Sequence, residues 1–284
     1  MLVMDFSQVM LSNIMVQLGN HTNVDLDENL VRHMILNSIR SYKTKLGPEY
    51  GELIIATDSK NYWRRKLFPY YKANRKKSQS ESELDWKAIF ECLNKMKHEL
   101  RTYFPYRVIE IEGAEADDII GTLCMEFGNT NKKIMILSGD KDFQQLQRFV
   151  NVRQYDPVRK KNIVCNDPDK FLIEHVLKGD PGDGIPNVLS EDNCFVLGSR
   201  QKPLTQKRMS DMMQIGLEGK YDHPVYRNYM RNKELIDLTM IPKDIQLKIL
   251  ESYDEQENKK PKQLMEYFIA NRLRNLTESI GDFT

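Results

Sequence analysis

The 284-residue sequence has no long apolar run, few cysteines and no clustered histidines. No stretch approaches the ~20 consecutive apolar residues of a membrane-spanning helix, so we expect no membrane partner. The N-terminus lacks a basic region followed by a long apolar core, which argues against a signal peptide. The four cysteines are widely separated and form no C-x-x-C pair, as is typical of free thiols in a reducing compartment. We therefore expect a cytoplasmic protein.

Missing motifs argue against several reaction classes. The five histidines do not have the spacing of a zinc site. The sequence contains neither the G-x-x-x-x-G-K-[ST] loop of many ATPases nor the G-x-S-x-G motif of serine hydrolases. The formal net charge is only +1, so any attraction to nucleic acid must come from local basic patches.

Three acids open an apolar stretch at Glu115-Ala116-Asp117-Asp118. The stretch has helical spacing, so the three carboxylates lie in its first turn. One or two acids there complement the helix dipole, but three repel one another unless something neutralises them. A hard divalent cation, which prefers oxygen ligands, would do so. Taken alone, the stretch fits a well-capped, solvated helix start equally well.

Apolar runs alternate with helical patterns through the first half of the chain. Runs at 2–6, 53–57, 107–111 and 132–138 predict strands, and 150–155 predicts a fifth. A helix is expected from residue 25 to residue 46, ended by the pair Gly47-Pro48. This alternation predicts an α/β fold with a parallel sheet covered on both faces.

Acidic residues follow four of the predicted strands. Asp5, Asp58 and Asp140 lie at or just after a strand's carboxyl end, as does Glu112 or Glu115. In a parallel sheet these ends share the edge where ligands bind, so we expect the carboxylates to converge. An all-carboxylate site suits Mg²⁺ or Mn²⁺, and two such ions would clamp a scissile phosphate and activate a water. The candidate metal ligands are Asp5, Asp58, Glu115, Asp117, Asp140, Asp142, Asp180 and Asp183.

The segment 60–77 combines eight basic residues and five aromatic residues with no acid. Cations that follow phosphates and rings that stack on bases are what a single-stranded nucleic acid requires. The alternative is a solvated loop whose tyrosines pack on the core. Lys72 and Arg75 are natural phosphate clamps, because cations near a developing phosphorane charge stabilise it.

Glycine, proline and aspartate gather at 179–188, after a predicted helix at 167–178. This composition predicts a tight loop whose exposed N–H groups, at Gly182 and Gly184, could receive a phosphate. Alternatively, its aspartates only stabilise turns. A mostly helical pattern continues to residue 284. It includes a second basic set, namely Arg200, Lys202, Lys207 and Arg208.

Taken together, these motifs resemble those of the 5′-nucleases, the family of flap endonucleases and 5′→3′ exonucleases. Their order and spacing hold over roughly the first two thirds of the chain. The basic segment and the C-terminal sequence are most similar to the T-even-phage ribonuclease H branch, which would place the protein in a host cytoplasm. The matching motifs are Asp5, Thr57-Asp58, Phe68-Pro69-Tyr70-Tyr71-Lys72-Ala73-Asn74-Arg75, Glu115-Ala116-Asp117-Asp118, Ser138-Gly139-Asp140-Lys141-Asp142-Phe143 and Gly179-Asp180-Pro181-Gly182-Asp183.

The resemblance implies a PIN-like nuclease core at 1–165, with a basic arch segment at 60–100. A helical DNA-binding region at 166–284 would contain a helix–three-turn–helix near 167–210. Asp58, Glu115, Asp117 and Asp140 would hold the first ion, with Asp5 acting through water, and Asp142, Asp180 and Asp183 the second. Lys72, Arg75, Asp117 and Asp140 would be catalytic. Nucleic-acid contacts are expected from Arg64, Arg65, Tyr71, Lys72, Arg75, Lys76, Lys77, Gly182, Gly184, Lys202, Lys207 and Arg208.

Residues 186–200 depart from the family pattern, because they lack the usual second glycine cluster and lysine of a potassium-assisted duplex grip. The main hypothesis is a metal-dependent 5′-nuclease acting on ends, flaps or RNA primers of DNA and RNA–DNA duplexes. The alternatives are a non-hydrolytic DNA-binding protein and a magnesium-dependent phosphomonoesterase. The resemblance implies a single-strand-binding protein or a sliding clamp as a replication partner, and we expect a monomer.

Overall fold

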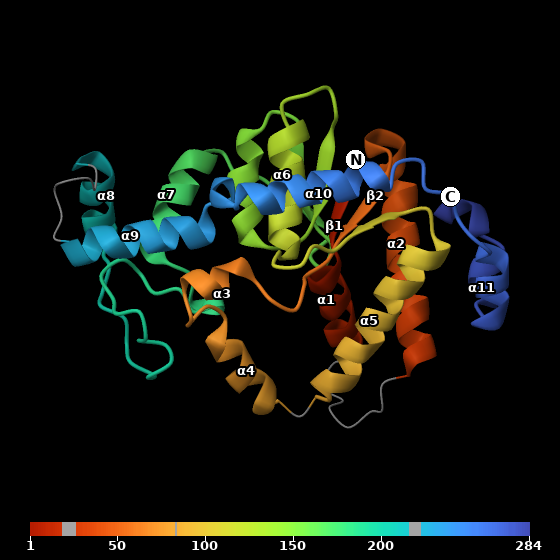
Figure 1. Ribbon diagram of the computed structural model, residues 1–284, viewed down its shortest axis with the longest axis horizontal. Coiled ribbons are helices and arrows are strands. Elements are labelled where there is room, and N and C mark those ends of the chain that lie inside the picture. Colours follow the sequence, from red (N-terminus) through yellow and green to blue (C-terminus); the bar gives the residue numbers. More distant parts are fainter. Residues whose placement is uncertain (19–26, 83, 216–222) are drawn as a thin grey trace.

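The computed structural model describes residues 1–18, 27–82, 84–215 and 223–284. It contains a six-stranded sheet in the order β3-β2-β1-β4-β5-β6 (Figure 1). The first five strands pair in parallel, and β6 pairs antiparallel with β5. The predicted α/β fold is therefore confirmed. The strands are β1 (Leu2–Asp5), β2 (Leu53–Ala56), β3 (Arg107–Ile109), β4 (Ile134–Leu137), β5 (Val152–Asp156) and β6 (Lys161–Ile163).

Helices cover the sheet and extend the molecule to one side, where α7, α8 and α9 lie (Figure 1). The α-helices are α1 (Phe6–Leu18), α2 (Glu28–Tyr50), α3 (Trp63–Leu67), α4 (Ala73–Ser80), α5 (Trp86–Tyr103), α6 (Ala116–Phe127), α7 (Pro168–Lys178), α8 (Gln206–Ile215), α9 (His223–Ile236), α10 (Lys243–Glu255), α11 (Leu264–Ala270) and α12 (Arg274–Thr277). Short 3-10 segments are η1 (Lys141–Arg148), η2 (Pro181–Asp183), η3 (Leu238–Met240) and η4 (Ile280–Phe283).

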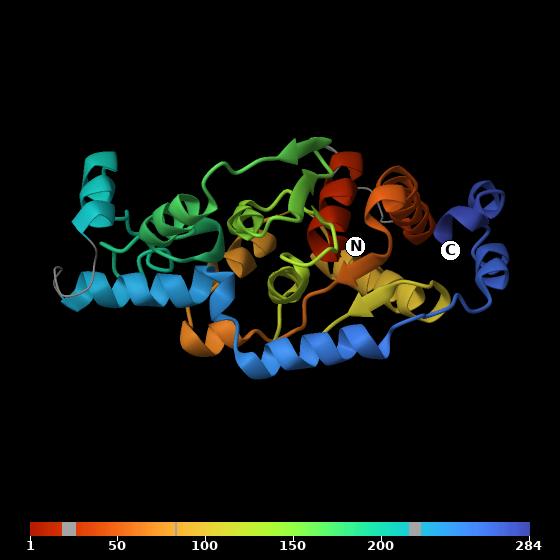
Figure 2. The same ribbon diagram turned by 90° about the horizontal axis from the view of Figure 1, so that it is seen from above.

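The central strands β1, β2 and β4 are buried on both faces, because they are apolar apart from the terminal Asp5. Along β1, Leu2 and Met4 face one core while Val3 faces the other, as the two-residue period of a strand requires. The first core includes side chains from α1, α2 and α5, and the second includes side chains from α6 and α10. Figure 2 accordingly shows α2 and α10 on opposite sides of the sheet.

The end of α2 differs from the prediction. The helix continues through Pro48 to Tyr50, so the expectation that Gly47-Pro48 would end it is wrong. Proline near a helix end removes a single N–H donor, which the packing of a long helix outweighs. The N–H of Gly51 then donates to Gly47 O at 2.7 Å and closes the helix.

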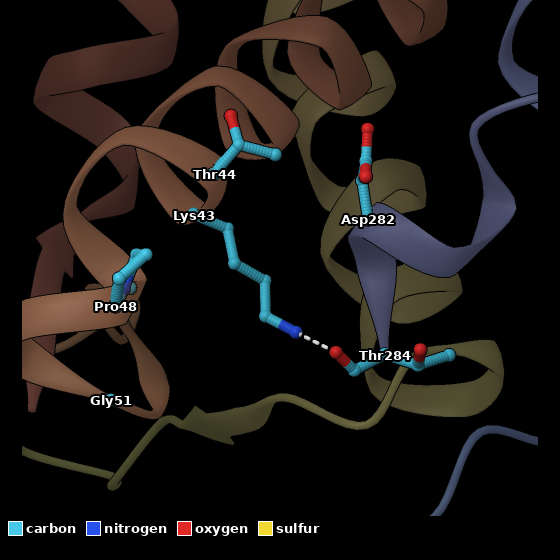
Figure 3. A pocket seen from close by; sticks show the side chains of 7 residues that line it. Lys43, Thr44, Pro48, Gly51, Asp282 and Thr284 are labelled. Carbon is cyan, nitrogen blue, oxygen red and sulfur yellow. Dashed lines mark hydrogen bonds between the residues drawn. The ribbon is translucent and has the colours of Figure 1, made fainter.

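The C-terminal segment returns to the α/β core. Side chains of α10 pack in the core with α6, and Phe268 of α11 packs in the core with α2 and α5. Lys43 of α2 donates to the carbonyl of Thr284 (Figure 3). The boundary near residue 165 stays a prediction, although these contacts place α10 and α11 with the core. None of the described helices is long and apolar enough to cross a membrane.

Candidate active site

Four neighbouring strands, β3, β2, β1 and β4, place acidic residues at one edge of the sheet. Asp5 ends β1, Asp58 lies two residues after β2, and Asp140 lies three residues after β4. Glu115 caps α6, the helix that follows β3. Because the strands are parallel and adjacent, their carboxyl ends bring these acids to a common edge.

Burial and mutual repulsion raise the pKa of acids at this edge. Burial raises the pKa of Asp5 to about 7, and the charges of Asp58 and Asp140 add to the effect. Burial and the charge of Asp140 likewise raise the pKa of Asp117 well above its usual range. Asp58 Oδ1 accepts a hydrogen bond from the N–H of Ala116 at 2.9 Å, which ties this acid to the start of α6. Such facing carboxylates favour a bound cation or proton.

A second group of acids adjoins Asp140. Asp142 lies in η1, and Asp180 and Asp183 come from the loop after α7. Burial raises the pKa of Asp142 well above its usual range, with further contributions from the charges of Asp140 and Asp180. The strand ends and the glycine-rich loop therefore share one continuous acidic centre.

A histidine that the sequence analysis missed belongs to this second group. His175, in the last turn of α7, has Nδ1 3.5 Å from Asp142 Oδ1 and Nε2 3.3 Å from Asp180 Oδ2. Ligand atoms from these three residues all lie within 4.8 Å of one another, as in metal sites. Burial would raise the pKa of Asp180, but hydrogen bonds from His175 and Lys141 lower it. The signal in the sequence is the position of His175 at a helix end, five residues before Asp180.

Glu115 is surrounded by hydrogen-bond donors. Lys72 Nζ lies 2.5 Å from Oε1, Arg64 Nη1 lies 2.9 Å from Oε2, and the Tyr71 hydroxyl oxygen lies within 3.2 Å of both carboxylate oxygens. Burial opposes ionisation, but Lys72 and Arg64 hold the pKa of Glu115 below its usual value. These donors balance the charge of the buried Glu115 carboxylate. Metal binding by Glu115 stays a prediction.

Two residues expected to contact nucleic acid are buried instead. Arg64 of α3 is only 2% exposed, pairs with Asp118 at 2.8 Å and donates to the carbonyl of Leu235. Tyr71 is also 2% exposed and donates to Asp183 Oδ2 at 3.0 Å. The polar ends of both residues face the acidic centre, and their contact with nucleic acid stays a prediction.

Lys72 and Arg75, in the second half of the basic segment at 60–77, contact the acids. Lys72 has a left-handed backbone with φ 56°, and its N–H donates to Asp183 O at 2.7 Å. Arg75 Nη2 lies 2.5 Å from Asp183 Oδ1. The Lys72 side chain is 9% exposed and that of Arg75 is 53% exposed, so Lys72 lies inside the centre and Arg75 lies at its opening.

The loop after α7 uses its own backbone donors. The N–H of Gly182 donates to Asp180 Oδ1 at 2.8 Å, and the N–H of Gly184 donates to Pro181 O at 3.2 Å. Gly184 is also buried against the backbone of Tyr70. Both N–H groups are bonded within the turn, and their binding of a phosphate stays a prediction.

The remaining predicted nucleic-acid contacts lie nearer the surface. The Arg65 guanidinium lies 5.0 Å above the ring of Tyr62, and Lys202 pairs with Glu191 at 3.2 Å. The first turn of α8 exposes further basic side chains. The side chains of Lys76 and Lys77, in α4, fall outside the described part of the chain. Contact with nucleic acid stays a prediction for Arg65, Lys76, Lys77, Lys202, Lys207 and Arg208.

Comparison with known proteins agrees with this fold. A sequence profile for the N-terminal resolvase-like domain of 5'-3' exonucleases matches residues 11–174. A profile for the C-terminal domain of T4 RNase H matches residues 167–283. The chain therefore belongs to the 5'-3' exonuclease family of nucleases. It is similar to Ribonuclease H of Enterobacteria phage T4, with 33% identity over 291 residues that cover 99% of this chain and 95% of that protein.

Two solved structures share the fold. The T5 5'-exonuclease with bound zinc has a TM-score of 0.66 and 18% identity, covering 92% of this chain and 99% of that one. A bacteriophage T5 flap endonuclease in a complex with DNA and metal ions has a TM-score of 0.63 and 19% identity, covering 90% of this chain and 98% of that one. At such identities the likeness shows a shared fold, which confirms the expected PIN-like core with a helical C-terminal region.

Proposed function

We propose that this chain is a divalent-metal-dependent 5′-nuclease that hydrolyses phosphodiester bonds at the 5′ ends, flaps or RNA primers of duplex nucleic acid. The observation that carries the proposal is the meeting of acids from four strand ends and the loop after α7 beside Lys72 and Arg75. A DNA-binding protein without hydrolytic activity would not need buried, mutually repelling carboxylates. A phosphomonoesterase would not need the cationic, aromatic segment at 60–77.

The acids present fit divalent cations. Asp142 Oδ1 is buried and has no hydrogen-bond partner among the residues that the structure describes, as suits an oxygen facing a cation. Burial and neighbouring carboxylates raise the pKa of Asp5 and of Asp117, so a bound cation would stabilise their charged forms. Oxygen ligands favour Mg²⁺ or Mn²⁺. We assign one ion to Asp58, Glu115, Asp117 and Asp140, with Asp5 acting through water, and a second ion to Asp142, Asp180 and Asp183.

The protein's own cations support phosphoryl chemistry at this edge. When bound, the two metal ions would polarise the scissile phosphate and lower the pKa of an attacking water. Lys72 Nζ and the Arg75 guanidinium place fixed positive charge where the reacting phosphate gains negative charge. Glu115 holds Lys72 and Asp183 holds Arg75, so both cations are positioned before a substrate arrives.

The surface around the centre suits a duplex with a single-stranded 5′ end. The basic segment at 60–77 would follow the single strand, and α7, the loop after it and α8 would form the helix–three-turn–helix that grips the duplex backbone. The complex of a T5 flap endonuclease with DNA, on the same fold, supports this assignment. We propose DNA and RNA–DNA duplexes as substrates, a monomeric enzyme, and a single-strand-binding protein or sliding clamp as replication partners.

One assay tests the proposal. A 5′-labelled flap duplex is incubated with the protein in Mg²⁺, in chelator, and with the variant Asp117→Asn. We expect cleavage only by the unaltered protein in Mg²⁺, because the variant removes a proposed ligand while keeping its shape. Cleavage that survives chelation or the substitution would rule out the metal mechanism. Binding without cleavage would favour a DNA-binding protein, and phosphate release only from monoesters would favour a phosphomonoesterase.

A further inference from the structure

His175 is a buried side chain with one unsatisfied ring nitrogen. Its side chain is 5% exposed, and it lies in the last turn of α7. Nδ1 has no hydrogen-bond partner among the residues that the structure describes, and the same holds for Asp142 Oδ1. These two atoms face each other at 3.5 Å. Buried polar atoms without partners are rare in native proteins, so this pair calls for an explanation.

The second ring nitrogen identifies the tautomer. Nε2 lies 3.3 Å from Asp180 Oδ2, a hydrogen-bonding contact, whereas the contact of Nδ1 with Asp142 meets no hydrogen-bond criterion. Asp180 is itself fixed, because Lys141 Nζ lies 3.0 Å from Oδ2 and the N–H of Gly182 donates to Oδ1. The network therefore assigns the proton to Nε2 and leaves a lone pair on Nδ1. Two hydrogen-bond acceptors, each with a free lone pair, then face each other, an arrangement that a shared cation stabilises.

We infer that His175 Nδ1 and Asp142 Oδ1 are adjacent ligands of one divalent cation, and that this nitrogen makes the second metal site favour Mn²⁺ over Mg²⁺. The inference rests on the proposed function, since it concerns a metal ion of the same centre. Asp180 then acts mainly as the carboxylate that orients the imidazole. The sequence resemblance implies only the three aspartates Asp142, Asp180 and Asp183 at this site. The histidine ligand is inferred from the structure instead.

The geometry agrees with shared coordination. Adjacent ligands at ~2.1 Å from one octahedral ion lie ~3.0 Å apart, so the two atoms, now 3.5 Å apart, would need to close by only ~0.5 Å around a shared ion. A histidine that binds a metal usually donates its other N–H to a carboxylate, as Nε2 does to Asp180. Imidazole nitrogen suits transition metals, whereas Mg²⁺ prefers oxygen alone.

The test measures the ligand directly. Mn²⁺ bound to the full chain is examined by electron spin echo envelope modulation, which detects a coordinating ¹⁴N nucleus. The variants are His175→Gln, which keeps an N–H toward Asp180 but lacks Nδ1, and His98→Gln as a control on the exposed face of α5. Calorimetric titrations compare Mn²⁺ with Mg²⁺ for all three proteins.

We expect imidazole modulation in the unaltered protein and in His98→Gln, and its loss in His175→Gln. Mn²⁺ affinity should fall ~10-fold or more in His175→Gln, with a much smaller change for Mg²⁺. Bound Mn²⁺ without nitrogen modulation in the unaltered protein would overturn the inference, and would identify His175 as an imidazolium bridging two carboxylates. This spectrum needs no variant, so misfolding of His175→Gln leaves the test intact. Metal-dependent cleavage of the flap duplex without nitrogen modulation would leave the proposed function standing, whereas failure to cleave with any metal would reject that function instead.

Discussion

The ammonium group of Lys72 lies 2.5 Å from Glu115 Oε1, and both side chains are buried. This contact joins the basic segment at 60–77 to the first turn of α6. Burial would lower the pKa of Lys72, but the surrounding negative charge keeps it well above the usual value. Lys72 is therefore a permanently charged group held beside the acids, rather than a mobile surface lysine.

The first prediction concerns the variant Lys72→Ala. We expect the single-turnover cleavage rate of a flap duplex to fall by ~100-fold, because a preorganised cation near the reacting phosphate is removed. Duplex affinity, measured in chelator, should change far less, since many surface cations share the phosphate contacts. Lys66→Ala is the matched control, because this lysine is exposed in the same segment. Equal losses of rate and affinity for Lys72→Ala would show that Lys72 is only a phosphate anchor.

The second prediction contrasts two neighbouring arginines. Arg64 is buried between Glu115 and Asp118, so Arg64→Ala leaves two carboxylates without their partner and should cost ~3–5 kcal/mol of unfolding free energy. Arg65→Ala should change stability by less than ~0.5 kcal/mol and weaken salt-dependent duplex binding. Urea unfolding and binding titrations in several salt concentrations measure both effects. A stable Arg64→Ala protein with weakened DNA binding would instead support Arg64 as a nucleic-acid contact.

The sheet and its acidic edge could be predicted from the sequence. Parallel strands buried on both faces are continuous apolar runs, so the four runs ending near Asp5, Asp58, Ile111 and Ser138 were recognisable without a structure. An acid follows each run, and the convergence of these acids follows from the topology, because parallel strands end at one edge of the sheet. These inferences depend on local composition and on chain direction, both of which the sequence contains.

The partners of individual side chains could not be predicted in the same way. Arg64 and Arg65 are adjacent and chemically identical, yet the orientation of α3 buries one and exposes more of the other. His175 meets Asp142 only because α7 packs beside η1, a contact between distant segments. The N–H groups of the loop after α7 could equally have faced a ligand or their own turn. Each of these outcomes depends on tertiary packing rather than on spacing along the chain.

The third prediction concerns pH in the absence of divalent metal. The pKa of Asp5 is about 7 in the folded protein, against an ordinary value of 3.8. Between pH 3.8 and about pH 7, Asp5 holds a proton in the folded state that it has lost in the unfolded state. Asp5 therefore stabilises the fold at low pH. Its contribution is full below the ordinary pKa and is lost as pH rises toward about 7, with a slope of up to ~1.4 kcal/mol per pH unit.

The variant Asp5→Asn isolates this effect, because the amide keeps the shape of the neutral acid. We expect the unfolding free energy in chelator to fall more steeply with rising pH for the unaltered protein than for Asp5→Asn. Other titrating groups contribute to both proteins, so the difference between the two curves is the quantity to measure. Parallel curves would show that Asp5 is already ionised throughout this range.

The last prediction uses two glycines with similar backbones. Gly184 has φ 73° and Gly198 has φ 66°, so a side chain at either position meets the left-handed strain that glycine avoids. A Cβ at Gly184 would lie 2.9 Å from the carbonyl oxygen of Tyr70, whereas a Cβ at Gly198 would meet nothing within 4 Å. Both alanine variants should therefore lose ~1 kcal/mol of stability, and only Gly184→Ala should lose more.

The extra loss has a functional consequence, because the loop at Gly184 carries Asp183. A displaced loop breaks the hydrogen bond between the N–H of Lys72 and Asp183 O, and with it the alignment of Lys72 beside Glu115. We expect Gly184→Ala to cleave a flap duplex at least ~10-fold more slowly than Gly198→Ala at a temperature where both are folded, since small misplacements of reacting groups are costly. Equal rates would mean that the basic segment and the loop position their charged groups independently.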